Sequence, residues 1–421
     1  MKKRQVWMQA ILMIVFLAAT HLSAQDLRKE GKYWIGEFNK TFSVSPGGSL
    51  IMDEIRGDVD IRTWDKNEVS VHEIRRMDIF TKNEAEAAMK ESETGFRQNG
   101  NTIRIGGSGF DRKWISSRFE ITVPVVFNCD IETQGGDLTI SGTKGDASMS
   151  TGGGDIELKQ IDGTVDVSTG GGDIDIIETT KRVTAKTGGG DIDISNSQGS
   201  VHVTTGGGDV SIDRSKDRVK VQTGGGDVDI SDAEGDIDVR TGGGEITLSD
   251  VAGDVSVGTG GGEIDIRNIG GTFEASTGGG DIYAKTVTGA LNVETGGGEI
   301  ELVDIKSRVD VSTGGGDVSV EMTLSDFTAD HTVNIRTGGG DIDLAIPENM
   351  PATIDATIKY NKRNWEDYEI TSDFSLKIKT TDDDSRYRII QATGDINGGG
   401  DPVTLRTGGG NIRITKRQLH Q

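Results

Sequence analysis

Hydrophobic residues recur along most of this chain with a fixed period of 18 residues. Counting from the threonine of each Thr-Gly-Gly-Gly-Asp segment as position 0, apolar residues stand at +5 and +7, at +14 and +16, and often at +10. Each pair alternates with polar residues, as in a short strand with one buried face. Ile246 and Leu248 form one such pair, and Ile237 and Val239 form the other. The pattern predicts two strands per period, with all of these apolar residues facing inward.

The glycine-rich segment marks where each period begins. A fixed period of roughly 20 residues is typical of solenoids, in which each repeat buries its apolar face against its neighbours. We therefore predict an all-β fold, a flat two-sheet β-solenoid with 18-residue rungs and irregular caps at both ends. Copies begin at Thr133 (degenerate), Thr151, Thr169, Thr187, Thr205, Thr223, Thr241, Thr259, Thr277, Thr295 and Thr313, then, after a six-residue insertion, at Thr337, and finally at Thr407.

The three glycines of each copy predict a corner that needs positive φ or a close approach that no Cβ allows. On this basis we expect Gly225→Val to be more damaging than Ser231→Val. Proline supports an uninterrupted ladder of hydrogen bonds, because none of the five prolines lies between Pro124 and Pro347.

Four segments follow along the chain. Residues 1–24 have the basic start, apolar run and small-residue end of a signal peptide that is removed on export. Residues 25–130 lack the period and form an N-terminal cap, with one helix at Lys82–Glu93 capped by Thr81 or Asn83. Residues 131–346 form the solenoid, and residues 347–421, including the copy at Thr407, form a C-terminal cap. Alternation predicts cap strands at Ser49–Met52, Asp58–Arg62, Val69–Ile74, Thr102–Ile105, Phe119–Val123, Thr353–Lys359, Phe374–Lys379 and Arg386–Gln391.

The net charge limits the possible partners, and the cysteine content limits how the fold can be stabilised. The formal net charge is −23, and it becomes more negative once the basic leader is removed. Such an acidic surface argues against nucleic acid and against electrostatic binding to anionic lipid. Without the leader we also expect no direct membrane insertion. The single cysteine, Cys129, excludes an internal disulfide, so stability must come from stacking of the rungs.

Several segments resemble a family of bacterial envelope β-repeat proteins that carries an adhesin label. The resemblance rests on Gly57-Asp58-Val59-Asp60-Ile61, on Val123-Pro124, on the stacked Gly-Asp-Ile-Asp-Ile segments, and on Ile346-Pro347 leading into Ala352–Ala356. It covers nearly the whole chain after the leader. It implies the stacked β fold, and an adhesin-like role at the envelope.

Carboxylates repeat at +4 in every full copy and at +6 in many. Both positions have the parity opposite to the core, so stacked rungs would repeat these charges about every 4.8 Å on the surface. One interpretation is a calcium-stabilised roll, since calcium takes six to eight oxygen ligands and glycine-rich β-rolls bind it. The other is that each +4 carboxylate accepts hydrogen bonds from glycine N–H groups at the corner. The +4 residues are Asp155, Asp173, Asp191, Asp209, Asp227, Glu245, Glu263, Asp281, Glu299, Asp317 and Asp341.

The threonine at position 0 has two interpretations. A column of threonines can form an ice-binding ladder, but the parity of Thr169 matches the core residues Val165 and Val167. We therefore predict that its side chain turns inward and bonds its hydroxyl to the corner backbone.

The rival class is a carbohydrate-active β-helix enzyme, which needs convergent acids or bases and sugar-stacking aromatics. The repeats are uniform; Trp34, Trp64, Trp114 and Trp365 fall in the caps, and histidines 72, 202, 331 and 420 are scattered, as surface histidines are. We therefore assign no catalytic or cofactor-binding residue and leave metal ligands open.

The sequence predicts an exported, non-enzymatic rod that binds or scaffolds at the cell envelope. Its partner would be an envelope protein or a polysaccharide. The calcium-stabilised roll and the carbohydrate-active enzyme remain as alternatives.

Overall fold

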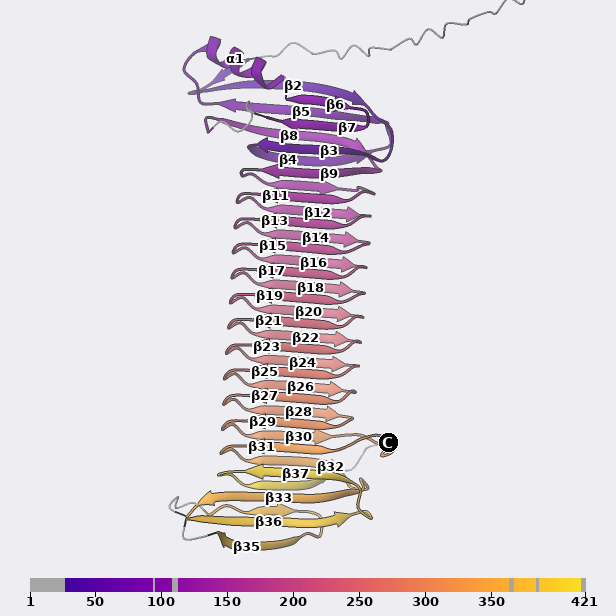
Figure 1. Ribbon diagram of the computed structural model, residues 1–421, viewed down its shortest axis with the longest axis vertical. Helices are drawn as coiled ribbons and strands as arrows, with labels where there is room; N and C mark the ends of the chain where they lie inside the picture. The colour runs from indigo at the N-terminus through magenta and orange to yellow at the C-terminus, as the bar shows by residue number, and fades with distance from the viewer. Residues whose placement is uncertain (1–26, 94, 108–112, 363–366, 384–385, 418–421) are drawn as a thin grey trace, which may run out of the picture.

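A computed structural model describes residues 27–93, 95–107, 113–362, 367–383 and 386–417. The expected signal peptide, 1–24, lies outside these residues. Two long sheets lie face to face and form a straight rod, with a helix at its N-terminal end (Figure 1). Within the described residues each sheet has 19 strands. This confirms the predicted flat two-sheet solenoid.

The regular part of the rod, residues 127–347, is called the shaft. Successive strands alternate between the two sheets, and each pairs in parallel with the strand one rung away, as Val228 does with Ile246. The first sheet contains β10 (Leu138–Ser141), β12 (Ile156–Ile161), β14 (Ile174–Thr179), β16 (Ile192–Ser197), β18 (Val210–Ser215), β20 (Val228–Ala233), β22 (Ile246–Val251), β24 (Ile264–Ile269), β26 (Ile282–Val287), β28 (Ile300–Ile305), β30 (Val318–Met322) and β32 (Ile342–Pro347). The second contains β9 (Phe127–Thr133), β11 (Ala147–Thr151), β13 (Val165–Thr169), β15 (Val183–Thr187), β17 (Val201–Thr205), β19 (Val219–Thr223), β21 (Ile237–Thr241), β23 (Val255–Thr259), β25 (Phe273–Thr277), β27 (Leu291–Thr295), β29 (Val309–Thr313) and β31 (Val333–Thr337).

The apolar positions of the repeat fill the space between the two sheets. Residues at +5, +7, +14 and +16 are buried along the whole shaft, and they belong to one continuous core. Phe273 is fully buried beside Val255 and Leu291 of the adjacent rungs, and small Ala275 follows it at +16. Large and small side chains thus compensate along a strand, as close packing requires.

Backbone with positive φ occurs in the shaft at a position that the sequence does not mark with glycine. The +9 residue is left-handed in successive rungs, for example Asn196 (φ 57) and Asp232 (φ 54). The ladder skips this residue, since β16 and β18 pair Ser195 with Asp213 and then Ser197 with Ser215. A left-handed residue bends the strand there, so the side chain at +10 turns into the core.

At the N-terminal end, one rung lies between strands that follow it in sequence. β3 (Gly48–Ile55) pairs with both β7 (Thr102–Gly106) and β9, and β4 (Gly57–Trp64) pairs with both β8 (Ile115–Pro124) and β10. Residues 48–64 are therefore a complete rung, although the 18-residue period is absent from them. Beyond them lie β1 (Arg28–Glu30), β2 (Tyr33–Ser43), β5 (Glu68–Met77), β6 (Phe96–Asn99) and the helix α1 (Lys82–Glu93).

The helix begins where the sequence predicted. The Thr81 hydroxyl accepts a hydrogen bond from the Glu84 amide at 3.3 Å, and the Glu84 carboxylate accepts one from the Thr81 amide at 3.1 Å. This reciprocal pair is a capping box, which makes Thr81 the N-cap. Within the described residues no helix is both long enough and apolar enough to cross a bilayer.

At the C-terminal end, too, one rung lies between strands that are distant from it in sequence. β37 (Asp401–Thr407) pairs with β31 on one side and β33 (Ala352–Asn361) on the other, while β38 (Ile412–Arg417) lies between β32 and β34 (Ile370–Ser372). The copy at Thr407, which we had assigned to the C-terminal cap, is therefore the last rung of the solenoid. β36 (Tyr387–Ile396) and β35 (Lys377–Asp383) close the second sheet beyond β33.

Candidate functional site

The two long edges of the shaft differ in what they present to solvent. On the glycine edge, formed by positions 0 to +4, each threonine turns inward as predicted. Thr169 Oγ1 donates to the Gly154 carbonyl of the preceding rung at 2.8 Å and accepts from the Gly172 amide at 3.2 Å. The threonine hydroxyls therefore make their hydrogen bonds to backbone groups inside the protein. This removes the basis for an ice-binding ladder.

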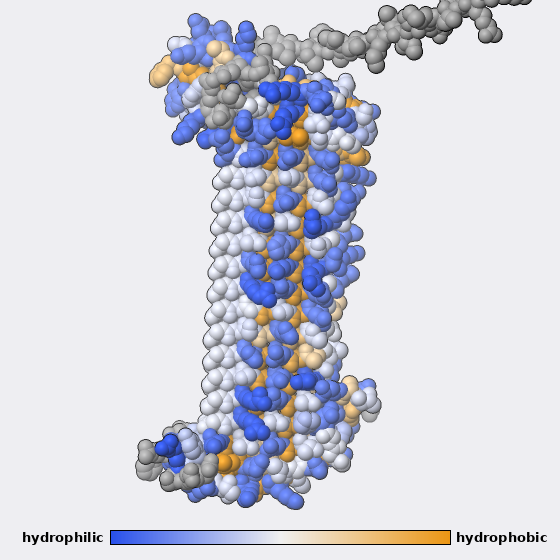
Figure 2. All heavy atoms as spheres, in the orientation of Figure 1, coloured by the Kyte–Doolittle hydropathy of each residue, from blue (hydrophilic) through white to orange (hydrophobic). Residues whose placement is uncertain are grey.

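Only the first and third glycines of each copy are sterically required. A Cβ on Gly224 would lie 2.1 Å from the Gly206 carbonyl oxygen, and one on Gly226 would lie 1.9 Å from that of Gly208. A Cβ on the middle glycine, Gly225, would meet nothing within 4 Å, and its φ is not positive. The reason given for expecting Gly225→Val to be damaging was therefore wrong. In Figure 2 the glycine edge is a smooth pale strip along the shaft.

The +4 aspartates accept hydrogen bonds from the backbone of the next rung. Asp155 Oδ1 accepts the amide of Asp173 at 2.9 Å, and Asp173 Oδ1 accepts the amide of Asp191 at 2.9 Å. The donor is the +4 amide of the next rung, not a glycine amide as we expected. A charge-assisted bond to the backbone still accounts for an acidic residue here. The same contact is made by Asp137, Asp191, Asp209, Asp227, Asp281, Asp317 and Asp341.

Two carboxylates at +6, Asp175 and Asp193, have a pKa above the usual range. Partial burial, followed by the charges of Asp191 and Asp173, raises the pKa of Asp193, and burial together with Glu157 raises that of Asp175. Across the described part of the chain, no group of three or more His, Cys, Asp or Glu is arranged to hold a metal ion.

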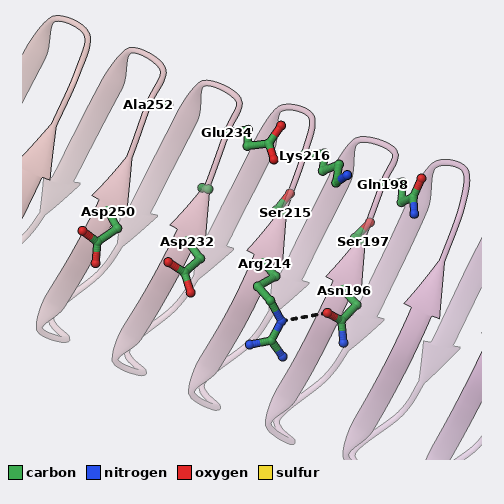
Figure 3. A pocket seen from close by; sticks show the side chains of 11 residues that line it. Asn196, Ser197, Gln198, Arg214, Ser215, Lys216, Asp232, Glu234, Asp250 and Ala252 are labelled. Atoms are coloured by element: carbon green, nitrogen blue, oxygen red, sulfur yellow. Dashed lines mark hydrogen bonds between the residues drawn. The ribbon is translucent and has the colours of Figure 1, made fainter.

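The opposite edge of the shaft contains a long groove. Two adjoining hollows of about 440 and 460 Å³ share Asn196 and Gln198 and together extend over seven rungs. One wall is the column of +9 residues and the other is the column of +11 residues, with the +10 residues between them. Figure 3 shows these two rows along part of the groove. The walls are Gln160, Glu178, Asn196, Arg214, Asp232 and Asp250 on one side, and Asp162, Thr180, Gln198, Lys216, Glu234 and Ala252 on the other.

The groove walls are polar and carry charges of both signs. Arg214 Nε donates to Asn196 Oδ1 at 2.7 Å, and Thr180 Oγ1 donates to Asp162 Oδ1 at 2.7 Å, so neighbouring rungs are linked along each wall. Hydroxyls at +10 are buried; Ser197, for example, donates to the Gly199 carbonyl at 3.1 Å. The groups that face the groove are therefore the amides, carboxylates and cations of the two walls.

We did not predict the groove, although its residues repeat at fixed positions. The available signal was the run of long polar side chains at +9 and +11 around a small +10 residue. Its shape depends on the left-handed residue at +9. Asn196, Asp232 and Asp250 favour that conformation more than most residues, and this was a second signal, although Arg214 in the same column gives none.

Comparison with known proteins supports the repeat architecture. The chain matches the family Toastrack DUF4097 over residues 51–235 and 231–399. It belongs to the Toastrack family. No curated protein and no solved structure matches it. The first Toastrack match begins inside β3, in the rung that precedes the periodic sequence, so the family pattern includes the intercalated N-terminal rung.

The remaining candidate residues of this Toastrack protein lie away from the groove. His331, expected at the surface, is only 3% exposed. Its Nδ1 lies 2.9 Å from the Ala329 carbonyl oxygen and its Nε2 lies 2.9 Å from that of Pro351. The ring thus joins the insertion before β31 to the C-terminal end. His420 and Trp365 lie outside the described residues.

Proposed function

We propose that this Toastrack protein is an exported, non-enzymatic, adhesin-like rod of the cell envelope that binds an extended polysaccharide along the groove of the shaft. The observation that carries the proposal is the groove itself, which offers polar side chains in register over seven rungs. A site of this shape suits a linear ligand, because successive rungs present polar groups about every 4.8 Å.

The chemistry of the walls favours a neutral or weakly charged sugar polymer. Amides such as those of Asn196 and Gln198 donate and accept at once, which suits sugar hydroxyls. The shaft holds 40 Asp and Glu against 15 Lys and Arg. Such a surface repels polyanions, including nucleic acids.

Repetition also explains how modest contacts give useful affinity. A polymer that lies across several rungs makes the second and later contacts at high effective concentration, so weak individual bonds combine. Longer chains of the same sugar should therefore bind more tightly than short oligomers, up to roughly 30 Å, the length of seven rungs.

The export assignment rests on the leader-like composition of residues 1–24. The non-enzymatic assignment rests on the lining of the groove, which among the described residues contains no histidine and no aromatic residue, since a carbohydrate-active enzyme needs convergent acids or bases together with groups that stack on sugars.

Binding of purified envelope polysaccharides to the chain from Gln25 onward tests the proposal. The variant Asn196→Gly, Gln198→Ala, Lys216→Ala removes three wall side chains, and glycine keeps the left-handed backbone at 196. At about 0.5–1.5 kcal/mol per lost hydrogen bond, we expect affinity to fall about tenfold or more.

The matched control is Ser211→Ala, Gln222→Ala, Asp229→Ala, which removes three exposed side chains from the sheet faces and should bind normally. Equal loss in both variants, or no binding by the unaltered chain, would contradict the groove assignment. Release of shortened sugars on prolonged incubation would show the enzyme alternative to be correct.

A further inference from the structure

The N-terminal tip of the rod exposes aromatic side chains in one place. Four large hydrophobic residues are exposed among those the structure describes, and two of them, Phe80 (95%) and Trp114 (37%), line the same two adjoining hollows of about 420 and 580 Å³. Ile79 and Ala87 complete the apolar wall of the first hollow. We call this surface, formed by Ile79, Phe80, Ala87 and Trp114, the tip patch.

The exposure of Phe80 departs from the usual chemistry of a helix start. Phe80 precedes the N-cap Thr81, and an apolar residue at that position commonly packs onto the fourth helical residue, here Ala85. Ala85 is fully buried in a small hydrophobic cluster with Phe38, Met77, Ala88, Met89 and Ile115, whereas Phe80 projects into solvent. The helix cap is complete without it, so local folding does not require an aromatic residue there.

Basic residues surround the tip patch. Arg76 and Lys113 line the second hollow with Tyr33, and the Arg76 guanidinium lies 3.6 Å from the centre of the Tyr33 ring. Two acidic residues also line the hollows: Asp78 pairs with Lys32 at 2.7 Å, and the Glu84 carboxylate accepts the Thr81 amide of the helix cap at 3.1 Å. Aromatic rings beside Lys and Arg are the composition of surfaces that sit in the interfacial layer of a bilayer.

The charge of this end also differs from that of the shaft. Residues 27–126 hold 16 basic and 16 acidic side chains, whereas the shaft holds 15 and 40. The argument from net charge against lipid contact therefore applies to the shaft and not to the tip, which carries no net repulsion toward a membrane.

The chain enters the fold at this same end. Leu27, the first residue that the structure describes, packs beside Ile79 against the hydrophobic cluster that contains Ala85, and α1 lies at the outer end of the rod (Figure 1). In the sequence, the apolar run Val6–Ala19 ends only eight residues before Leu27. Eight residues span at most about 28 Å, so a membrane that held this run would lie close to the tip patch.

We propose that the tip patch docks onto the interfacial layer of a lipid bilayer and stands the rod upright, with the groove directed away from the membrane. Phe80 and Trp114 insert between headgroups, and Arg76 and Lys113 contact the phosphates. The occupant is lipid and not a protein partner, because Arg76 and Lys113 lie beside the exposed aromatic rings and the patch is at the end of the rod that follows the apolar run in sequence.

Flotation of the chain from Gln25 onward with vesicles tests the proposal, using pure phosphatidylcholine and an equimolar mixture of phosphatidylethanolamine and phosphatidylglycerol. We expect binding to both, with Phe80→Ser, Trp114→Ser reducing the partition coefficient about tenfold or more. Ile378→Ser, which removes an exposed apolar residue from β35 at the other end, should have no effect. Circular dichroism confirms that both variants are folded.

A second measurement keeps the proposal testable if the double variant does not fold. Brominated lipids should quench the fluorescence of the unaltered protein, and Trp114→Phe should remove most of that quenching. Absence of vesicle binding, binding without quenching, or an equal effect of Ile378→Ser would overturn the proposal. So would a synthetic peptide of residues 1–24 that occupies the patch while vesicles do not.

Discussion

Residues 127–347 carry 40 acidic side chains against 15 basic ones, whereas residues 27–126 hold 16 of each and residues 348–421 hold 11 of each. The shaft and the ends also differ in what they bury. Along its 18-residue repeats the shaft buries aliphatic residues with Thr and Ser, whereas the N-terminal end buries the charged pair Glu73 and Arg75. The difference shows that a repeated sequence specifies neighbours one rung away, while each end depends on contacts that occur once.

The largest expected effect comes from placing a charge in the shaft core. Ile246→Asp puts a carboxylate in a slot without polar partners, and it should cost at least about 4–5 kcal/mol and unfold neighbouring rungs. Outward-facing Asp229→Ala should change stability by less than about 0.5 kcal/mol. Thermal melts of the two variants check the inward and outward assignments, which equal shifts would refute.

The second-largest loss of stability should come from breaking the buried ion pair at the N-terminal end. Arg75 Nε donates to Glu73 Oε1 at 2.8 Å, and both side chains are fully buried. Arg75→Met leaves a buried carboxylate without its cation and should cost about 3–5 kcal/mol. The double variant Glu73→Leu, Arg75→Met should recover most of this loss. Denaturant titration followed by tryptophan fluorescence measures it, and a neutral single variant would contradict the buried charge.

The glycine edge offers a sharper test within the shaft. Gly226→Ala places a methyl group against the Gly208 carbonyl and should cost about 1–3 kcal/mol. Gly225→Ala meets open space and should be neutral, or stabilise by about 0.4–1 kcal/mol by restricting the unfolded chain. Melting temperatures of the two single variants decide it. Similar losses at both positions would mean that the corner backbone is not as described.

The smallest expected effect is that of calcium. We predict that the acidic columns respond weakly, and similarly, to calcium and to magnesium at matched ionic strength, because screening acts on any cation. A ligand bound only to the folded state would instead stabilise it by about 2.7 kcal/mol at a hundredfold excess over its Kd. Melts of chelator-treated protein with each ion distinguish the two. A calcium-specific rise lost in Asp173→Asn, Asp191→Asn, Asp209→Asn would establish the calcium-stabilised roll.

Most of the shaft was predictable because its determinants are local in sequence. Alternation at +5 and +7 placed Ile246 and Leu248 in the core, and parity alone turned Thr169 inward. The intercalated rungs were not predictable, since the pairing of Leu50 with Cys129, or of Thr337 with Thr407, joins segments that share no common spacing. The groove also escaped prediction, because its shape follows from left-handed backbone at +9. Asn196 and Asp232 favour that conformation, but Arg214 in the same column does not, so the column carried no uniform signal.

The central claim is that rungs of the shaft are interchangeable units between two unique ends. Deleting residues 206–241 removes two complete repeats and joins Thr205 to Gly242, which restores the Thr-Gly-Gly-Gly register. We predict a folded protein with both ends intact and a rod shortened by about 10 Å, measured by small-angle scattering. Deleting residues 206–232 removes one and a half repeats, joins Thr205 to Ala233 and should not fold. If the two-repeat deletion failed to fold or kept the original length, or if both deletions behaved alike, the stacked-rung account would be contradicted.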